Sequence, residues 1–196
     1  MKIQTIAFAL AGLLVAGSLF AHSHSGEADS DSKMTAEQMD AHHAEMMQEI
    51  LNSPWRTDAN KARDVYRHPA ETLAFFGLTP HSKVIEIWPG GGWYADILVP
   101  YATKHGSYTA AVNDPASIEK ESSKAYYAKA NKGLSDKFAA NPEAFSKATM
   151  VLIDPAKPVL GKPGSADLVL TFRNVHNWRM ANQQDGMFAA FFAVLK

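Results

Sequence analysis

The chain has 196 residues, of which 46% are hydrophobic and 20% charged, as is typical of a globular protein long enough to bury a core. A formal net charge of -1 and the lack of a basic stripe argue against nucleic acid as a partner. The absence of cysteine excludes a disulfide framework and a thiolate metal site.

Residues 1–21 have the features of a secretory signal peptide. Lys2 supplies a short positive segment, and the apolar run over 6–20 is short for a bilayer span. An uncleaved anchor helix is the less favoured alternative. We therefore expect an exported, periplasmic protein that begins near His22 and has no stable membrane span after cleavage. The polar residues 22–34 are expected to form a disordered tail.

Residues 35–82 are expected to form an N-terminal helical region. Thr35 and Gln38 have the spacing of a capping box at the start of a helix. Side chains that recur there at helical spacing are Met39, His43, Met46, Met47 and Ile50. A second helical stretch over 61–80 is interrupted by Pro69, which suits the first turn of a helix.

From residue 83 onward, strand and helix patterns alternate. Short apolar runs predict strands at 83–88, 107–114, 147–154 and 166–172, and the segments between and after them predict helices at 93–103, 115–140 and 182–196. This alternation indicates βαβ units, and strands that are apolar throughout indicate helices on both faces. The predicted fold is α/β, with a Rossmann-like, doubly wound, mainly parallel sheet over residues 83–196.

Two of these helices carry an apolar stripe that we expect to be buried. In the helix at 115–140 the stripe consists of Ala125, Tyr126, Leu134 and Phe138. In the helix at 182–196 it consists of Met187, Phe188, Phe191, Phe192 and Leu195.

A glycine-rich turn follows the first strand. Gly90-x-Gly92-x-x-Ala95 matches a dinucleotide-binding pattern, and Asp114 lies where an acidic residue would bind a ribose hydroxyl. Glycines here let the backbone approach a ligand near the N-terminus of a helix. The alternative is a turn that only packs the helix on the strand. Glu86, inside the apolar strand, needs a donor, either backbone N–H groups or a cofactor ammonium.

The segment EIWPGGG (86–92) resembles the first motif of class I S-adenosyl-L-methionine (SAM)-dependent methyltransferases, E/D-x-G-x-G-x-G, with Trp88 in place of the first glycine. Residues 63–102 and 166–178 resemble, more narrowly, a family of exported predicted methyltransferases. The likeness extends over about residues 55–196. It implies the class I fold with SAM as cofactor.

In the resembling family, the helix that ends this chain at AVLK leads into a glycine-rich turn and further strands. The resemblance therefore implies a sheet truncated after the helix that follows the fourth strand. We expect an apolar edge along that strand.

The resemblance also implies a set of cofactor-binding residues. The methionine end of SAM would be lined by Glu86, Gly90, Gly91 and Gly92. Asp114 or its neighbour Asn113 would bind the ribose, and Asp154 would lie near the adenine unless it is a turn carboxylate. Trp88 either packs under the turn or narrows the pocket.

The segment TFRNVHNW follows the fourth strand, where such methyltransferases hold substrate-facing groups. His176 could accept a substrate proton near neutral pH, and Arg173 or Asn174 could orient the acceptor. Alternatively, Asn174 and His176 cap the next helix.

The function we expect is methyl transfer from SAM, by in-line displacement, to a small-molecule or cell-envelope substrate. One alternative is an NAD-type oxidoreductase, which the glycine pattern supports. Another is a non-catalytic exported binding protein whose N-terminal segment holds a metal such as copper through His22, His24, Met39, His42, His43, Met46 and Met47. Those side chains also suit a methionine-lined packing face.

Overall fold

A computed structural model of the chain describes residues 34–196. The predicted signal peptide, and residues 22–33 of the predicted tail, lie outside the described residues. Residues Thr35–Lys196 form one compact unit, so the N-terminal helical region packs together with the sheet. No helix among the described residues is both long and apolar enough to cross a bilayer.

The N-terminal helical region contains α1 (Ala36–Leu51), α2 (Asp58–Lys61), α3 (Asp64–Arg67) and α4 (Pro69–Phe75). The predicted capping box of α1 is present, because the Thr35 hydroxyl accepts from the Gln38 N–H at 3.3 Å and Gln38 Oε1 accepts from the Thr35 N–H at 2.9 Å. Pro69 occupies the first turn of α4 as expected.

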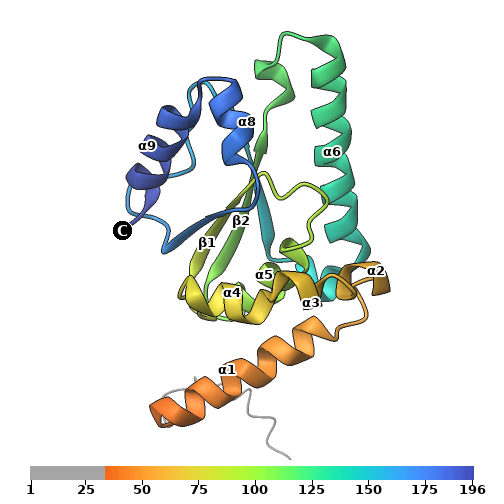
Figure 1. Cartoon of the computed structure of the whole chain (residues 1–196), viewed down its shortest axis with the longest axis vertical. Coiled ribbons are helices and arrows are strands. Elements are labelled where there is room, and N and C mark those ends of the chain that lie inside the picture. The colour runs from red at the N-terminus through yellow and green to blue at the C-terminus, as the bar shows by residue number, and fades with distance from the viewer. Residues whose placement is uncertain (1–33) are drawn as a thin grey trace, which may run out of the picture. The chain divides into compact units, whose positions relative to one another are not determined.

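The sheet has four parallel strands in the order β3-β2-β1-β4, as the alternating pattern predicted (Figure 1). The strands are β1 (Lys83–Ile87), β2 (Ser107–Asn113), β3 (Ala148–Ile153) and β4 (Leu168–Thr171). In register, Ile85 of β1 lies opposite Thr109 of β2 and Val169 of β4. β2 and β3 lie on one side of β1, and β4 lies on the other. The strand order therefore reverses between β1 and β4, which makes their junction a topological switch point.

Helices cover both faces of this sheet. They are α5 (Ala95–Ala102), α6 (Glu121–Ala140), α7 (Pro142–Phe145), α8 (Val175–Met180) and α9 (Gln184–Val194), with a 3₁₀ turn, η2 (Pro115–Ser117), after β2. Figure 1 shows α6 on one side of the sheet and α8 and α9 on the other. β3 runs to β4 through residues 154–167 without a helix.

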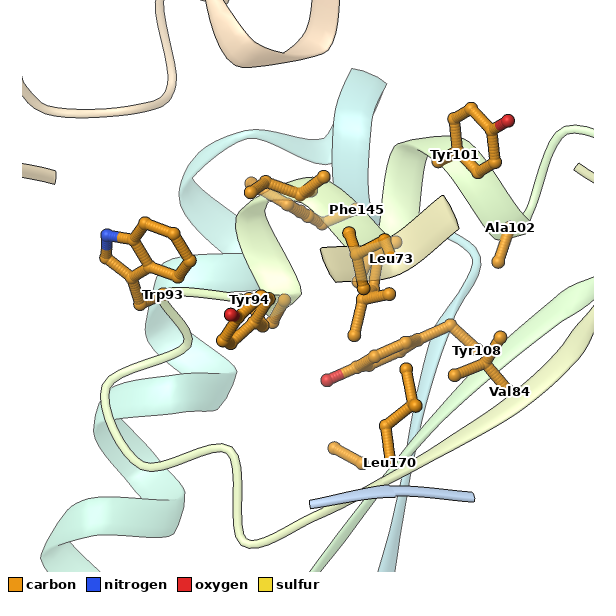
Figure 2. Packing of buried hydrophobic residues seen from close by; sticks show 14 of the residues in the cluster. Leu73, Val84, Trp93, Tyr94, Tyr101, Ala102, Tyr108, Phe145 and Leu170 are labelled. Carbon is orange, nitrogen blue, oxygen red and sulfur yellow. The ribbon is translucent and has the colours of Figure 1, made fainter. Parts of the chain in front are cut away.

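Each face has its own hydrophobic core, as the alternation of side chains along β1 requires. Val84 belongs to the cluster formed with α1, α4, α5, α6 and α7, whereas Ile85 and Ile87 belong to the cluster formed with α8 and α9. Figure 2 shows the Tyr108 ring of the first cluster between Leu73 and Leu170. Glu86 shares the face of Val84 and is therefore buried in the larger core.

The predicted buried stripes are correct in part. In α6, Leu134 and Phe138 are buried, but Ala125 and Tyr126 are exposed. In α9, Met187 and Phe191 are buried and Leu195 is half-buried, whereas Phe192 is 85% exposed and Phe188 48% exposed. The buried face of α9 follows Met187, Phe191 and Val194 instead.

β4 is an edge strand among the described residues, as expected. Just before β4, Leu195 forms a parallel bridge with Ala166, and the Lys196 N–H donates to the Ala166 carbonyl at 3.1 Å. The two residues after α9 therefore pair with the segment that leads into the fourth strand.

Candidate functional site

A pocket of about 180 Å³ lies at the carboxyl ends of the strands, beside the β1–β4 switch point. The glycine turn after β1, the end of β2, the first half of α6 and the start of α8 all contribute to it. Its lining residues are Trp88, Gly90, Val112, Asn113, Tyr126, Tyr127, Ala130, Asn131, Leu134, Asn174 and Asn177.

Trp88 lines this pocket, and its indole ring also packs against Trp178 of α8. Its backbone is left-handed, with φ of 51°, a conformation that favours the glycine found there in the methyltransferase motif. Its N–H donates to the Ala111 carbonyl at 2.9 Å, and its indole meets the Trp178 ring edge-on at 5.7 Å. The indole Nε1–H is buried without a hydrogen-bond partner among the described residues.

The three glycines of the turn serve different purposes. Gly90, with φ of 60°, and Gly91 face open space where a side chain would stand. A Cβ on Gly92, in contrast, would lie 2.9 Å from Leu134 Cδ1. The backbone of Gly90 and Gly91 is thus open to a ligand, whereas Gly92 allows α6 to pack on the turn.

Lys137 of α6 holds the glycine turn in place. Its Nζ donates to the carbonyls of Gly91 and Gly92, at 3.2 Å each, and lies 2.6 Å from Asp96 Oδ1. Burial raises the pKa of Asp96, and the ion pair with Lys137 opposes that rise. One ammonium group therefore links the turn to the start of α5.

Glu86 obtains its donor from a side chain that the sequence did not suggest. The Tyr108 hydroxyl donates to Glu86 Oε2 at 2.7 Å, and both groups are buried. Burial raises the pKa of Glu86 to about 7, although the bond from Tyr108 acts to lower it. Burial and the nearby Glu86 carboxyl raise the pKa of Tyr108, so the phenol keeps its proton and remains the donor.

The carboxylates that end β2 and β3 cap turns. Asp114 accepts from the Ala116 N–H, and Asp154 accepts from the Ala156 N–H, each at 2.9 Å. Neither lines the pocket, but Asn113 does, and its carbonyl accepts from Asn131 Nδ2 at 2.9 Å. Of the two residues expected at the ribose, the structure brings Asn113 to the pocket.

The three residues expected to face the substrate do not line one common pocket. Asn174 lines the pocket, and its amide donates to the Ile87 carbonyl at 3.0 Å and to Thr171 Oγ1 at 3.1 Å, which ties the end of β4 to the end of β1. Arg173 has a left-handed backbone, with φ of 65°, and lines a second pocket. His176 is exposed in the first turn of α8 and lines neither.

Comparison with known proteins identifies the fold. No protein-family model and no curated protein matches the sequence. Among solved structures, the chain is similar to a SAM-dependent methyltransferase from Aquifex aeolicus, at 16% identity and a TM-score of 0.51, over 79% of this chain and 67% of that one. The fold is that of a SAM-dependent methyltransferase.

Two further solved structures are similar at lower TM-scores. One is the YcgJ protein from Bacillus subtilis, with 14% identity and a TM-score of 0.46 over 67% of this chain and 47% of that one. The other is a SAM-dependent methyltransferase from Thiobacillus denitrificans in complex with S-adenosyl-L-homocysteine, with 15% identity and a TM-score of 0.42 over 76% of this chain and 51% of that one. This chain thus spans about half the length of each.

In this methyltransferase fold the pocket combines expected and unexpected residues. Of the expected set, Trp88, Gly90, Asn113 and Asn174 line it. Sequence reasoning missed the contribution of α6, namely Tyr126, Tyr127, Ala130 and Asn131, and the anchoring role of Lys137. Aromatic residues on an otherwise polar helix are the sequence signal for this contribution, but the helical spacing places Tyr126 in the predicted buried stripe.

The His- and Met-rich face of α1 packs against the rest of the fold. Met47 and Ile50 are buried, and Met46 packs partly buried against the larger core. Among residues 34–196 no three His, Asp or Glu side chains gather as a metal site. His22 and His24 lie outside the described residues. Of the side chains predicted to hold copper, Met46 and Met47 are therefore used in packing, whereas His42 is exposed and Met39 and His43 are half-buried.

Proposed function

We propose that the chain is a SAM-dependent methyltransferase that acts, after export to the periplasm, on a small-molecule or cell-envelope substrate. The observation that carries the proposal is the open backbone of Gly90, a residue of left-handed conformation that lines a pocket beside the switch point. The carboxyl ends of parallel strands are where open α/β sheets bind ligands. The fold agrees with this assignment but does not identify the reaction.

The residues of the pocket fit SAM. Gly90, which lines the pocket and faces open space where a side chain would stand, leaves room for the methionine end. Asn113 is the candidate for the ribose, since Asp114 caps a turn. Tyr127 supplies an aromatic surface for the adenine.

SAM supplies an electrophilic methyl group when bound. The protein's part is to place the acceptor in line with that group and to exclude water. Asn174 keeps the end of β4 fixed against the glycine turn, so the segment that follows it is held beside the pocket. His176 is the candidate proton acceptor for an acceptor that must lose a proton.

The NAD alternative is less well supported by the turn. In the dinucleotide pattern the second glycine lets the pyrophosphate approach the backbone. Here the corresponding residue, Gly92, faces Leu134 and Lys137 side chains of α6. No observation on the described residues favours NAD over SAM.

Calorimetric titration of the purified chain with SAM, S-adenosyl-L-homocysteine and NAD tests the proposal. We expect the first two to bind and NAD not to bind. Gly90→Leu should abolish binding, whereas Gly164→Leu, which imposes a similar backbone strain at φ of 67° in open space, should not.

A folded wild-type chain that binds neither SAM nor S-adenosyl-L-homocysteine would refute the proposal, and binding of NAD alone would replace it. Export is a separate element of the proposal. It requires that the chain recovered from a periplasmic fraction begin near His22.

A further inference from the structure

A second pocket, of about 450 Å³, lies beside the first and is rich in arginine. It is lined by Arg63, Arg67 and Arg173 together with Tyr66, Tyr94, Thr171 and Phe172. The segment after β4 contributes to both pockets, since Arg173 lines the second and the next residue, Asn174, lines the first. A molecule in the second pocket is therefore adjacent to the proposed cofactor site.

The positive charge of this pocket is not neutralised by the described part of the chain. No carboxylate of residues 34–196 forms an ion pair with Arg63, Arg67 or Arg173. Burial and the charges of the other two guanidinium groups all lower the pKa of Arg67. In contrast, the charge of Arg56 in the same region is neutralised, because its guanidinium group donates two 2.7 Å bonds to the Asp64 carboxylate.

The guanidinium group of Arg67 packs on an aromatic ring and donates no hydrogen bond to residues 34–196. Its guanidinium carbon lies 4.4 Å from the centre of the Trp93 ring, a cation–π contact that fixes the side chain. A guanidinium group fixed in this way keeps its fork of N–H donors for a planar oxyanion.

Two stacked aromatic rings form part of the wall of this pocket. The rings of Tyr94 and Phe172 stack with centroids 3.5 Å apart and an angle of 12° between their planes. Arg173, next to Phe172, has a left-handed backbone, and the residue after it, Asn174, donates to the Ile87 carbonyl at the end of β1. Strain of this kind at a pocket wall is a feature of functional sites.

We infer that this pocket binds an oxyanion, a carboxylate or a phosphate, carried by a small methyl acceptor that also has a planar apolar part. The inference deepens the proposed function. That the bound anion is a methyl acceptor rests on that function, whereas the anion site rests on the arginine residues alone. The anion would pair with Arg67, Arg63 and Arg173, and the planar part would lie against Phe172, the half-buried ring of the pocket wall.

Titration of the purified chain with phenyl phosphate, benzoate and benzyl alcohol tests this inference. We expect at least one of the two anions to bind and the neutral alcohol to bind at least tenfold more weakly. Arg67→Gln and Arg173→Gln should each weaken anion binding roughly tenfold, as the loss of a charge-assisted bond predicts. Arg179→Gln, an exposed arginine of α8 outside the pocket, is the matched control and should have no effect. The preferred anion distinguishes a phosphate from a carboxylate.

Three results would overturn the inference: no binding of either anion, equal binding of benzyl alcohol, or equal effects of Arg67→Gln and Arg179→Gln. S-adenosyl-L-homocysteine is titrated into the same variants. Its retained binding in Arg67→Gln shows that the cofactor site is folded. If it fails to bind the wild-type chain while anion binding still depends on Arg67, the proposed function fails and the anion site stands.

Discussion

Glu86 is a buried carboxyl group whose protonation is coupled to folding. Its pKa is raised from 4.5 to about 7 in the folded protein, so the folded state binds the proton more tightly than the unfolded state does. The contribution to stability is therefore fully present below about pH 4.5 and is lost as the pH rises through about 7. A shift of this size corresponds to an energy on the order of 3 kcal/mol.

Glu86→Gln should remove this part of the pH dependence. We expect the variant to be more stable than the wild type at pH 8, where the wild-type carboxylate is charged and buried, and the difference to shrink towards pH 5. Urea unfolding at pH 5, 6, 7 and 8 measures it. Because Asp96 also has a raised pKa, some slope should remain in the variant. An unchanged slope would mean that Glu86 is not the group that titrates.

The partner of Glu86 shows what sequence reasoning could and could not supply. The sequence shows that a carboxyl group lies inside an apolar strand and needs a donor. It does not show which residue of the next strand lies beside it, because that depends on the register. In the structure Glu86 lies opposite Ala110, and Tyr108, two residues earlier on the same face of β2, reaches the carboxyl group.

Among the elements, α6 contains Tyr126, a pocket residue that the sequence pattern wrongly predicts to be buried. Its helical period was read correctly, since Leu134 and Phe138 are buried. Its first half, however, lines the pocket instead of packing on the sheet, so Tyr126 is 66% exposed. The spacing of apolar residues gives the face of a helix but not the point at which the sheet beneath it ends. For α9, aromatic residues on more than one face left the stripe ambiguous.

Lys137 makes the glycine turn depend on α6. Lys137→Met should destabilise the protein by about 3 kcal/mol, because it leaves the buried Asp96 carboxylate without its cation. It should also weaken binding of S-adenosyl-L-homocysteine, since the carbonyls of Gly91 and Gly92 lose their donor. Urea unfolding and calorimetry measure the two effects.

Lys132→Met is the matched control on the same helix. Lys132 forms an ion pair with Asp136 at 2.6 Å, the distance found for Lys137 and Asp96, but both partners are exposed. We expect a change under about 0.5 kcal/mol. If the two variants are equally stable, Lys137 does not anchor the turn. If Lys137→Met is destabilised but binds normally, the anchor is not needed for the cofactor.

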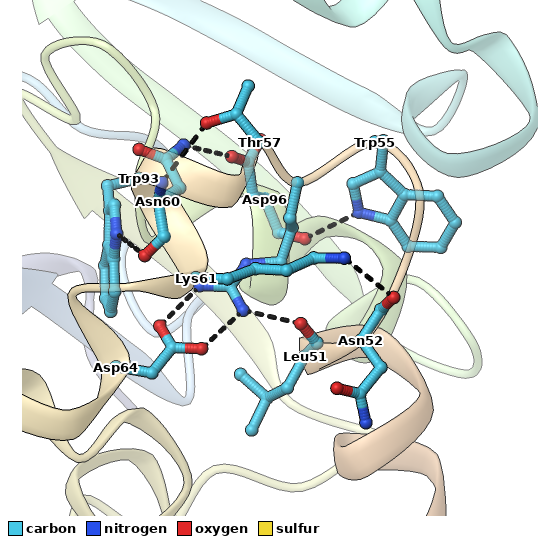
Figure 3. A network of polar contacts seen from close by, with 10 residues as sticks. Leu51, Asn52, Trp55, Thr57, Asn60, Lys61, Asp64, Trp93 and Asp96 are labelled. Carbon is cyan, nitrogen blue, oxygen red and sulfur yellow. Dashed lines mark hydrogen bonds and ion pairs between the residues drawn. The ribbon is translucent and has the colours of Figure 1, made fainter.

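At the scale of the whole described unit, the linking segment (residues 52–64) joins α1 to the methyltransferase fold. Figure 3 shows its polar contacts. Trp55 Nε1 donates to the Asp96 carbonyl at 3.0 Å, and Asn60 Nδ2 donates to Asp96 Oδ2 at 3.1 Å. In return, Trp93 Nε1 donates to the Asn60 carbonyl at 3.1 Å. Asp96, at the start of α5, and Trp93, after the glycine turn, are thus hydrogen-bonded to the N-terminal helical region.

The same segment positions the arginine-rich pocket. Asp64 begins α3, the helix that ends with Arg67, and its carboxylate holds Arg56, whose side chain is fully buried. Arg56 in turn donates to the Leu51 carbonyl at the end of α1 at 2.8 Å. We therefore expect the position of Arg67, at the end of α3, to depend on the ion pair between Asp64 and Arg56 at the start of that helix.

Asp64→Asn tests this dependence. The substitution keeps the shape of the side chain but leaves the buried Arg56 without its counter-charge, so we expect a loss of about 3 kcal/mol in urea unfolding. Asp136→Asn, which breaks an exposed ion pair, should cost under about 0.5 kcal/mol. Below the unfolding transition, Asp64→Asn should also weaken phenyl phosphate binding, because α3 is less firmly held. Normal phenyl phosphate binding in a destabilised Asp64→Asn would show that α3 keeps its place without this ion pair, and that the linking segment stabilises the fold without shaping the pocket.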